Sequence, residues 1–293
     1  MTHKAGFVNI IGNANVGKST LMNFLTGEKL SIITSKAQTT RHRIKGLVNT
    51  DDFQVVFSDT PGLLKPNYMM QEMMLKTAKT AFTDADIILF VTDVYDEYEE
   101  GNDIIKLLNK QKIPVILLIN KIDISHPAIV NQLIEKWKIL LPKAEIYSVS
   151  ALKGDNVLPL FQRIVDILPE NPPYYPKDML TDKPEKFFVS EIIREKILLY
   201  YRKEIPYSVE IMIEEFKEEG NLVKIRAIIY VERESQKGIV IGNKGLALKK
   251  TGTEARKDIE KFLNKKVFLE LYVKVDPDWR SKAVSLKKFG YGN

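Results

Sequence analysis

An eight-residue run near the start of the chain constrains the fold more than any other feature. Residues 12–19 read GNANVGKS and fit G-x-x-x-x-G-K-[ST], the pattern of a phosphate-binding loop. The apolar residues 7–11 before the loop predict a short buried strand, and residues 19–25 after it predict the start of a helix. A chance glycine-rich turn would rarely have both flanks, so we expect a strand–loop–helix unit that binds phosphate.

The chemistry of such a loop predicts a role for each part of it. Its glycines let the backbone turn tightly and point N–H groups at an anion. Lys18 is expected to contact the β- and γ-phosphates, and the Ser19 hydroxyl is expected to bind Mg²⁺ at the positive end of a helix dipole. The predicted nucleotide-binding residues of the loop are Gly12, Asn13, Ala14, Asn15, Val16, Gly17, Lys18, Ser19 and Thr20.

Length and composition limit the classes of protein that the chain can belong to. Its 293 residues suffice for one large domain or two ordinary ones. The absence of cysteine excludes disulfides, thiolate catalysis and cysteine-ligated zinc, and it suits a reducing cytosol. The start of the chain reads as a strand, not as a secretion signal. The longest apolar runs, residues 87–91 and 115–119, have the length of strands and are far too short to span a membrane.

The net charge of +6 is concentrated near the end of the chain. Residues 1–236 contain 30 Lys and Arg against 32 Asp and Glu, whereas residues 237–293 contain 14 against 6. A basic region suggests a phosphate-rich partner, either nucleic acid or an anionic lipid surface. A solvated lysine face is the alternative that charge alone leaves open.

The order of apolar and amphipathic segments predicts two domains. Over residues 1–169, strands alternate with helices, which is typical of an α/β domain with a mostly parallel sheet covered on both faces. The predicted strands are 7–11, 43–49, 53–58, 86–94, 114–120 and 145–150, and helices are expected at 102–110, 128–140 and 157–168. Strands 43–49 and 53–58 read as a hairpin, which would give one antiparallel edge strand.

A proline-rich segment separates this domain from a smaller one. Residues 169–176 contain four prolines, so we interpret residues 170–184 as a semi-rigid linker. Residues 185–293 then predict an α+β domain. Its expected elements are a helix at 185–203, strands at 207–215 and 222–231, helices within 238–263 and a strand at 266–275.

Two further motifs narrow the ligand of the first domain to a guanine nucleotide. Asp59 and Gly62 form D-x-x-G after a strand, where the carboxylate can hold a Mg²⁺-bound water and the glycine N–H can approach a γ-phosphate. Asn120, Lys121 and Asp123 follow an apolar strand at the edge where sheet ligands bind. The Asp123 carboxylate can accept from N1–H and the amino group of guanine, which adenine lacks at these positions.

The residues alone leave two details of this predicted base site open. Asn120 can bind the base or tie its loop to the phosphate loop, and the stem of Lys121 can cover the base. The backbone of a later loop could close over the base, and this weaker signal comprises Ser150, Ala151 and Leu152.

The second domain contains a G-x-x-G turn before a basic helix. Its glycines allow a nucleic-acid backbone to approach closely, and its lysines supply positive charge, which is the logic of a KH domain that clamps single-stranded nucleotides. We expect an apolar groove lined by residues 239–241 and by strand 222–231. The predicted RNA-binding residues are Gly238, Ile239, Ile241, Gly242, Asn243, Lys244, Gly245, Lys249 and Lys250.

In this order, the motifs of residues 4–169 resemble the translation-factor class of GTPases within the Ras-like fold. This resemblance implies GTP and Mg²⁺ binding, hydrolysis to GDP, and a switch threonine, for which we favour Thr40 over Thr39. Ser19, Thr40 and Asp59 would then bind the metal, with Lys18, Thr40, Gly62 and Asn15 as catalytic residues. Leu63 stands where Ras-like enzymes have a water-orienting glutamine, so intrinsic hydrolysis should be slow. Asn15 matches an asparagine that helps to coordinate K⁺ in a related subset, so we expect K⁺-stimulated hydrolysis.

With both domains in view, the whole chain resembles the Era family of bacterial GTPases, which combine a Ras-like domain with a type II KH domain. The phrases KAQTTRH at residues 36–42 and GIVIGNKG at residues 238–245 carry the resemblance. It implies binding near the 3′ end of small-subunit ribosomal RNA, a role in maturation of the small ribosomal subunit, and a cytoplasmic protein with loose association with the inner membrane face. We assume a monomer.

Two other functions fit parts of the sequence. The second domain could be a dimerisation or scaffold module of a pure enzyme. Alternatively, a membrane-surface GTPase could regulate the cell cycle or growth through a protein partner, with the KH-like domain as a scaffold and the basic residues 274–288 attracted to anionic lipid.

Overall fold

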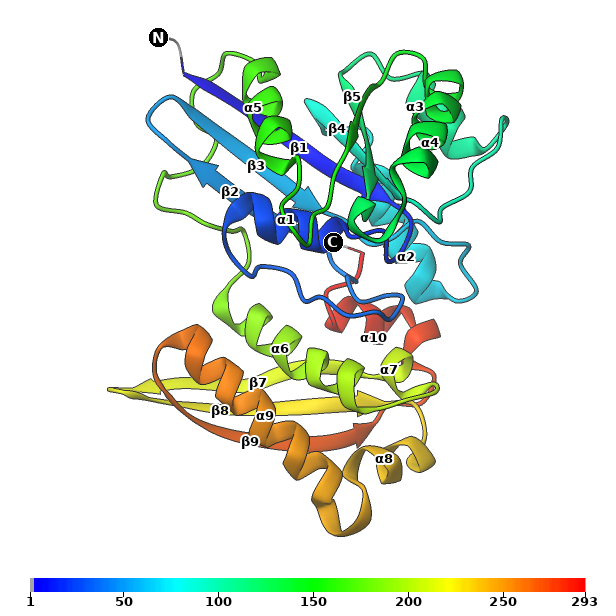
Figure 1. Cartoon of the computed structure of the whole chain (residues 1–293). Helices are drawn as coiled ribbons and strands as arrows, with labels where there is room; N and C mark the ends of the chain where they lie inside the picture. The colour runs from blue at the N-terminus through cyan, green and yellow to red at the C-terminus, as the bar shows by residue number, and fades with distance from the viewer. Residues whose placement is uncertain (1–2, 293) are drawn as a thin grey trace. The chain divides into compact units, whose positions relative to one another are not determined.

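The structure, a computed structural model, describes residues 3–292 and divides into two compact units (Figure 1). The first unit comprises the chain up to Ser31 together with Thr40–Lys65 and Met74–Asp182. The second comprises Ile32–Thr39, Pro66–Met73 and the chain from Lys183 onward. Two short segments of the first half of the sequence therefore belong to the second unit.

The first unit is built on a six-stranded sheet. Its strands are β1 (Lys4–Gly12), β2 (Ile44–Asn49), β3 (Phe53–Asp59), β4 (Ile87–Asp93), β5 (Val115–Asn120) and β6 (Glu145–Ser148), in the order β2-β3-β1-β4-β5-β6. Only β2 pairs antiparallel, with β3, while the other neighbours in this sheet pair parallel. The predicted α/β class and the antiparallel edge strand are confirmed. β1 begins three residues earlier than expected because Lys4 pairs with Phe53, which is a backbone effect that apolar patterning does not report.

Helices cover both faces of this sheet. They are α1 (Lys18–Thr26), α2 (Met69–Thr80), α3 (Asp103–Asn109), α4 (Pro127–Leu140) and α5 (Val157–Ile167). One buried cluster joins Ala78 of α2, Ile105 of α3 and Trp137 of α4 to Phe90 of β4, so these helices share a face. On the other face, Phe161 of α5 packs against Phe53 and Phe57 of β3, with ring centroids 5.9 and 6.3 Å apart. Because the parallel strands end at one edge, the predicted motif loops all lie there.

The second unit is a three-stranded sheet with helices on one face. Its elements from Lys183 onward are α6 (Glu185–Tyr200), α7 (Ile205–Ser208), β7 (Glu210–Glu219), β8 (Leu222–Val231), α8 (Glu234–Ile241), α9 (Leu246–Leu263), β9 (Lys266–Val275) and α10 (Ala283–Lys288), with short 3₁₀ turns at Asn243–Gly245 and Trp279–Ser281. Central β8 pairs antiparallel with β7 and parallel with β9. Buried Val189 of α6, Ala255 of α9 and Ile225 of β8 belong to one core.

Three expected bounds in this unit are wrong for physical reasons. The first helix ends at Tyr200 and not at residue 203, because Tyr201 has an extended backbone. The strand expected at 207–215 spans Glu210–Glu219, since its hairpin partner continues the pairing to Glu219 opposite Leu222. The helices expected within 238–263 begin four residues earlier, at Glu234, because the Gln236 side chain accepts from the Arg233 N–H at the helix start, and they are separated at the G-x-x-G turn as expected.

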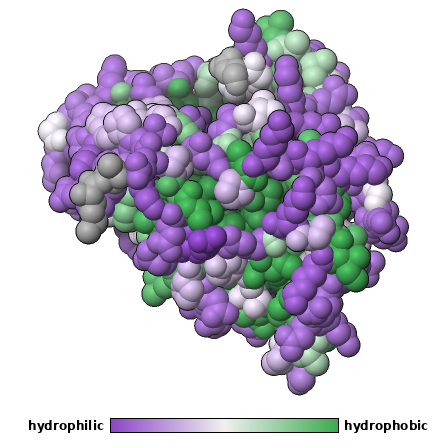
Figure 2. Space-filling view, turned by 90° about the horizontal axis from the view of Figure 1, so that it is seen from above, coloured by the Kyte–Doolittle hydropathy of each residue, from purple (hydrophilic) through white to green (hydrophobic). Residues whose placement is uncertain are grey.

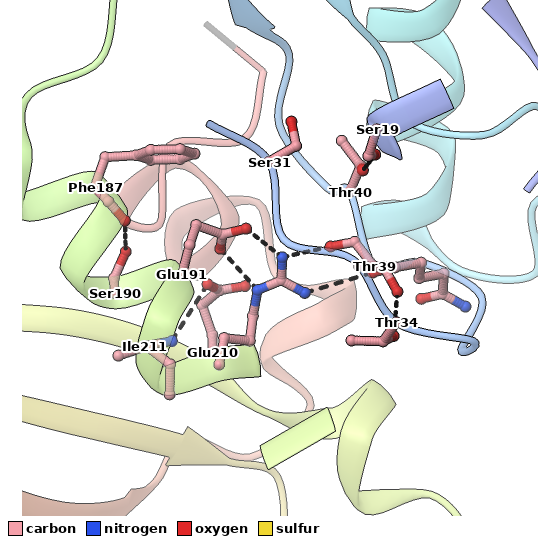
Figure 3. A network of polar contacts seen from close by, with 12 residues as sticks. Ser19, Ser31, Thr34, Thr39, Thr40, Phe187, Ser190, Glu191, Glu210 and Ile211 are labelled. Carbon is pink, nitrogen blue, oxygen red and sulfur yellow. Dashed lines mark hydrogen bonds and ion pairs between the residues drawn. The ribbon is translucent and has the colours of Figure 1, made fainter. Parts of the chain in front are cut away.

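The second unit holds its two early segments through buried polar contacts. Arg194 of α6 is ion-paired with Glu191 at 2.5 Å and donates to the backbone oxygens of Thr39 at 2.5 Å and Gln38 at 3.5 Å (Figure 3). Lys36, which belongs to the early segment, donates to the carbonyl oxygens of Leu198 and Tyr201 at the end of α6. These cations satisfy carbonyl groups that a helix end and an irregular segment would otherwise leave unpaired.

Within residues 3–292, none of the helices combines the length and apolar character needed to cross a bilayer. The face drawn in Figure 2 is mostly hydrophilic, with hydrophobic residues gathered in smaller areas between the polar ones.

Candidate functional site

The phosphate loop connects the end of β1 at Gly12 to the start of α1 at Lys18. The Lys18 ammonium is buried and donates to the carbonyl oxygens of Gly12 at 3.1 Å and Asn13 at 2.6 Å. Burial lowers the pKa of Lys18 to about 8, against the opposing effect of the Asp59 and Asp96 carboxylates. An anionic ligand beside Lys18 would favour the protonated ammonium and so oppose this effect of burial on the pKa.

Three hydroxyl groups converge on the Asp59 carboxylate. Its Oδ2 accepts from Ser19 Oγ at 2.6 Å, Ser31 Oγ at 2.9 Å and Thr40 Oγ1 at 3.4 Å. The Ser19 and Thr40 hydroxyls are 2.8 Å apart, and Figure 3 shows this contact. Its Oδ1 is buried and finds no hydrogen-bond partner among residues 3–292. Burial raises the pKa of Asp59. Hard oxygen ligands around an unsatisfied carboxylate fit a Mg²⁺ ion, which prefers such groups.

The two candidate switch threonines point to different neighbours. Thr40 Oγ1 lies beside Ser19 and Asp59, whereas Thr39 Oγ1 contacts Thr34 Oγ1 at 2.7 Å and donates to the Lys36 carbonyl oxygen at 2.6 Å. The geometry therefore favours Thr40 as the metal-side residue. Ser31 was missed by the sequence analysis, because no motif of fixed spacing includes it.

Close approaches explain why particular glycines occur in these loops. Gly17 has φ +97°, and a Cβ there would lie 2.2 Å from the side-chain nitrogen of Asn120. A Cβ on Gly62 would lie 2.7 Å from the backbone of Ala14. The phosphate loop is thus pressed against both the D-x-x-G loop and the loop after β5.

The loop after β5 is tied to the phosphate loop by Asn120. Its side-chain nitrogen donates to the Val16 carbonyl oxygen at 2.8 Å, and its Oδ1 accepts from the Ala151 N–H at 2.9 Å. Of the two roles left open for Asn120, these contacts favour the tie. Asp123 Oδ1 accepts from Ser150 Oγ at 2.7 Å, so the 150–152 loop orients this carboxylate.

The residues expected to govern hydrolysis lie nearby. Leu63 is buried against the α2–α4 cluster, and its N–H donates to the Gly12 carbonyl oxygen at 3.1 Å. Its side chain offers no hydrogen bond to a water molecule. Asn15 is exposed on the loop, with φ +66°.

The G-x-x-G turn of the second unit separates α8 from α9. Gly242 has φ +72°, and a Cβ there would lie 2.6 Å from the Ala247 side chain, so glycine is required. A groove of about 530 Å³ lies beside the turn, between α9 and β9. It is lined by Gly245, Leu248, Lys249, Gly252, Thr253, Arg256, Leu269 and Leu271.

The expected lining of this groove is partly wrong. Val240 and the apolar residues of β8, such as Ile225, are buried in the core, because β8 is the central strand under the helices. The edge strand β9 lines the groove instead. Of the predicted RNA-binding residues, Gly245 and Lys249 line it, while Lys250 lies 4.9 Å from the Tyr200 ring. The others occupy α8 and the turn: Gly238, Ile239, Ile241, Gly242, Asn243 and Lys244.

Sequence reasoning missed six groove residues, namely Leu248, Gly252, Thr253 and Arg256 of α9 and Leu269 and Leu271 of β9. Gly252, Thr253 and Arg256 follow Lys249 by three, four and seven residues, which is one to two helical turns, so the 3.6-residue period of α9 could have indicated these three once the groove was assigned to that helix.

A phosphate loop with D-x-x-G and N-K-x-D loops, followed by a G-x-x-G α+β unit, defines a Ras-like GTPase with a KH domain. Two family models agree: residues 7–121 match "50S ribosome-binding GTPase", and residues 204–280 match "KH domain". The chain is 46% identical over 291 residues to the GTPase Era of Staphylococcus haemolyticus, covering 99% of this chain and 97% of that protein. The chain therefore belongs to the Era family, and it is a GTPase.

Two solved Era structures are similar over nearly the whole chain. One is a complex of Era with MgGDPNP and nucleotides 1506–1542 of 16S ribosomal RNA, at 40% identity and a TM-score of 0.94. The other is a variant of Aquifex aeolicus Era bound to GDP·AlF₄⁻, at 41% identity and a TM-score of 0.94. Each comparison covers 99% of this chain and 100% of the other.

Proposed function

We propose that this GTPase is a switch that binds the 3′ end region of small-subunit ribosomal RNA and assists maturation of the small subunit. The observation that carries the proposal is that one chain has both a Mg²⁺-fitting hydroxyl and carboxylate cluster and a basic G-x-x-G groove. An Era structure at 40% identity contains MgGDPNP together with 16S ribosomal RNA nucleotides, which supports the same pair of ligands here.

In the nucleotide site, Ser19, Thr40 and Asp59 would hold Mg²⁺, which when bound neutralises negative charge on the phosphates. Lys18 and the backbone N–H groups of the phosphate loop bind and orient the phosphate chain. Asp123, oriented by Ser150, accepts from the guanine N1–H and amino group. The stem of Lys121 covers the plane of the base.

Hydrolysis requires an oriented water and added positive charge near the γ-phosphate. Leu63 cannot orient the water, so we expect slow intrinsic turnover. The exposed Asn15 could help to bind K⁺, which would supply charge where other GTPases use an arginine. The test is the initial rate of phosphate release in K⁺ and in Na⁺ at equal ionic strength. We expect faster release in K⁺, and equal rates would contradict this role.

In the second unit, Gly242 and Gly245 allow the RNA backbone to approach the turn between α8 and α9. Lys244, Lys249 and Lys250 supply positive charge, and Arg256 and Thr253 offer hydrogen-bond donors along the groove. Bases would lie against Leu269 and Leu271 of β9. Proteins recognise single-stranded RNA in this way because its unstacked bases are free to contact protein side chains.

The decisive experiment replaces Gly242 and Gly245 together by Asp and measures binding to an RNA of the 16S 3′ end. We expect RNA binding to be lost and GTP hydrolysis in the absence of RNA to be retained. Unchanged RNA affinity would support the scaffold alternative. Neutral variants of exposed Lys106 and Lys138 in the first unit lower the net charge by the same amount, and so control for a general effect of reduced positive charge on RNA binding.

We infer a cytoplasmic protein that associates peripherally with the inner membrane face, as the family resemblance implies. The basic residues 274–288 support this inference through attraction to anionic lipid. Cosedimentation with vesicles containing phosphatidylglycerol tests it, and neutralising Lys282, Lys287 and Lys288 should then abolish binding. Equal sedimentation with uncharged vesicles would contradict it.

A further inference from the structure

The turn after β4 connects two parts of the nucleotide site that the motifs leave separate. Asp93 is the last residue of β4, and its carboxylate is almost fully buried, with 8% of the side chain exposed. Its Oδ1 accepts from the backbone N–H groups of Tyr95 at 2.9 Å and Asp96 at 3.0 Å. Its Oδ2 forms an ion pair with Lys121 Nζ at 2.5 Å. The turn thereby fixes one carboxylate oxygen and presents the other to Lys121.

The same turn also reaches the phosphate loop. Asp96 Oδ1 accepts from the side-chain nitrogen of Asn13 at 3.1 Å. The carbonyl oxygen of Asn13 in turn accepts from Lys18 Nζ at 2.6 Å. The contacts therefore run from the base-covering lysine, through Asp93 and Asp96, to the lysine expected to contact the phosphates.

We propose that Asp93 and Asp96 are positioning residues for guanine nucleotides: Asp93 holds Lys121 over the base, and Asp96 holds the phosphate loop through Asn13. The inference rests on the proposed nucleotide site and adds two residues outside its motifs. A lysine side chain loses up to about 2 kcal/mol of conformational freedom when it is ordered. If Asp93 already orders the Lys121 side chain in the free protein, nucleotide binding does not include this loss of conformational freedom.

An ordinary surface ion pair would have little such effect, because exposed pairs contribute about 0–1 kcal/mol. The Asp93–Lys121 pair differs in two respects. Its acid is buried, and the free rotation of that acid is prevented by two backbone hydrogen bonds to the other oxygen. Hydrogen bonds to charged groups in such settings are stronger than neutral ones.

The first test is Asp93→Asn, which keeps an oxygen for the Tyr95 and Asp96 N–H groups but replaces the oxygen that accepts from Lys121. We expect the dissociation rate of fluorescently labelled GDP to rise about tenfold. KM for GTP should rise while kcat is retained, because Lys18, Ser19 and Asp59 are untouched. The matched control is Asp103→Asn, because the Asp103 carboxylate is fully exposed and pairs with Lys106 on α3. An unchanged GDP dissociation rate in Asp93→Asn would overturn the proposal.

A double-mutant cycle tests whether Asp93 acts through Lys121. Lys121→Met should itself weaken GDP binding, and Asp93→Asn should add less than twofold in that background. Fully additive effects would show that Asp93 acts by another route and would overturn the assignment. Thermal unfolding of each variant verifies folding. If Asp93→Asn does not fold, Asp93→Ser, whose hydroxyl can still accept from Tyr95, replaces it in the cycle.

Tripolyphosphate, which has no base, separates the two halves of the proposal. Asp96→Ala should weaken competition by tripolyphosphate about fivefold, whereas Asp93→Asn should leave it unchanged. Equal losses in both variants would indicate general disturbance of the turn and would contradict separate roles. A wild-type protein that does not bind GDP would instead refute the proposed nucleotide site, so the two failures are distinguishable.

Discussion

Asp59 brings together three hydroxyl groups of the nucleotide site. Three hydroxyl groups donate to one of its oxygens, while the other is buried and unsatisfied within residues 3–292. Leaving a buried carboxylate oxygen without a partner costs free energy. A divalent cation bound to this oxygen would offset that cost. We therefore expect cation binding to stabilise the site.

At the same scale, Asp123 allows a prediction about base specificity. Asp123→Asn should weaken GDP binding by about 100-fold and favour xanthine nucleotides, since the new amide donates to the C2 oxygen of xanthine where guanine has an amino group. Competition of labelled GDP by unlabelled GDP and XDP measures this change. No gain with XDP would argue against base recognition by this residue.

At the scale of elements, α6 combines an apolar core face with a buried ion pair. Arg194 and Glu191 are both nearly inaccessible, with 1% and 8% of their side chains exposed, and Arg194 also donates to Thr39 and Gln38 within the second unit. Replacing one member of a buried ion pair leaves the charge of the other member buried and uncompensated. Removing both members together avoids that penalty.

We therefore expect Arg194→Met to lower the free energy of unfolding by about 3 kcal/mol. Arg194→Met combined with Glu191→Met should recover most of that loss. Denaturant unfolding monitored at Trp279, which is buried in the second unit, measures both variants in a Trp137→Phe background. Equal destabilisation by the single and double variants would mean that the pair is not the source of the effect.

The α9–β9 groove yields a second prediction for elements. Arg256→Gln should weaken binding to 16S 3′-end RNA about tenfold, because an arginine of the groove donates to phosphate or to a base edge. Lys257→Gln is the matched control, since Lys257 follows Arg256 in α9 but contacts Glu254 and does not line the groove. Fluorescence anisotropy at fixed salt compares the two, and equal losses would point to charge alone.

At the scale of the whole molecule, the chain passes from one unit to the other between Thr39 and Thr40. Thr40 contacts the Ser19 and Asp59 side chains in the first unit, while Thr39 is held by Arg194 in the second. Two adjacent residues therefore contact different units. A ligand can shift such a system only through different affinity for its states.

We expect RNA to bind at least fivefold more tightly with GDPNP than with GDP, within the usual 1–3 kcal/mol range of coupling free energies. Thr40→Ala should remove that difference without abolishing GDP binding, because it deletes the contact on the metal side alone. Isothermal titration of RNA into each nucleotide complex makes the comparison. Identical affinities in wild type would refute the coupling.

By itself, the sequence determined the α/β and α+β classes, the antiparallel edge strand and the motif loops at one sheet edge. These features follow from local periodicity and from glycine, lysine and acid residues at fixed spacing, which act over a few neighbouring residues. Only the tertiary structure showed that Ser31 approaches Asp59, that Thr40 and not Thr39 lies on the metal side, that β9 and not β8 lines the groove, and that Asp93 pairs with Lys121. These contacts join residues that no local pattern relates, because strand order and packing, not spacing along the chain, bring them together.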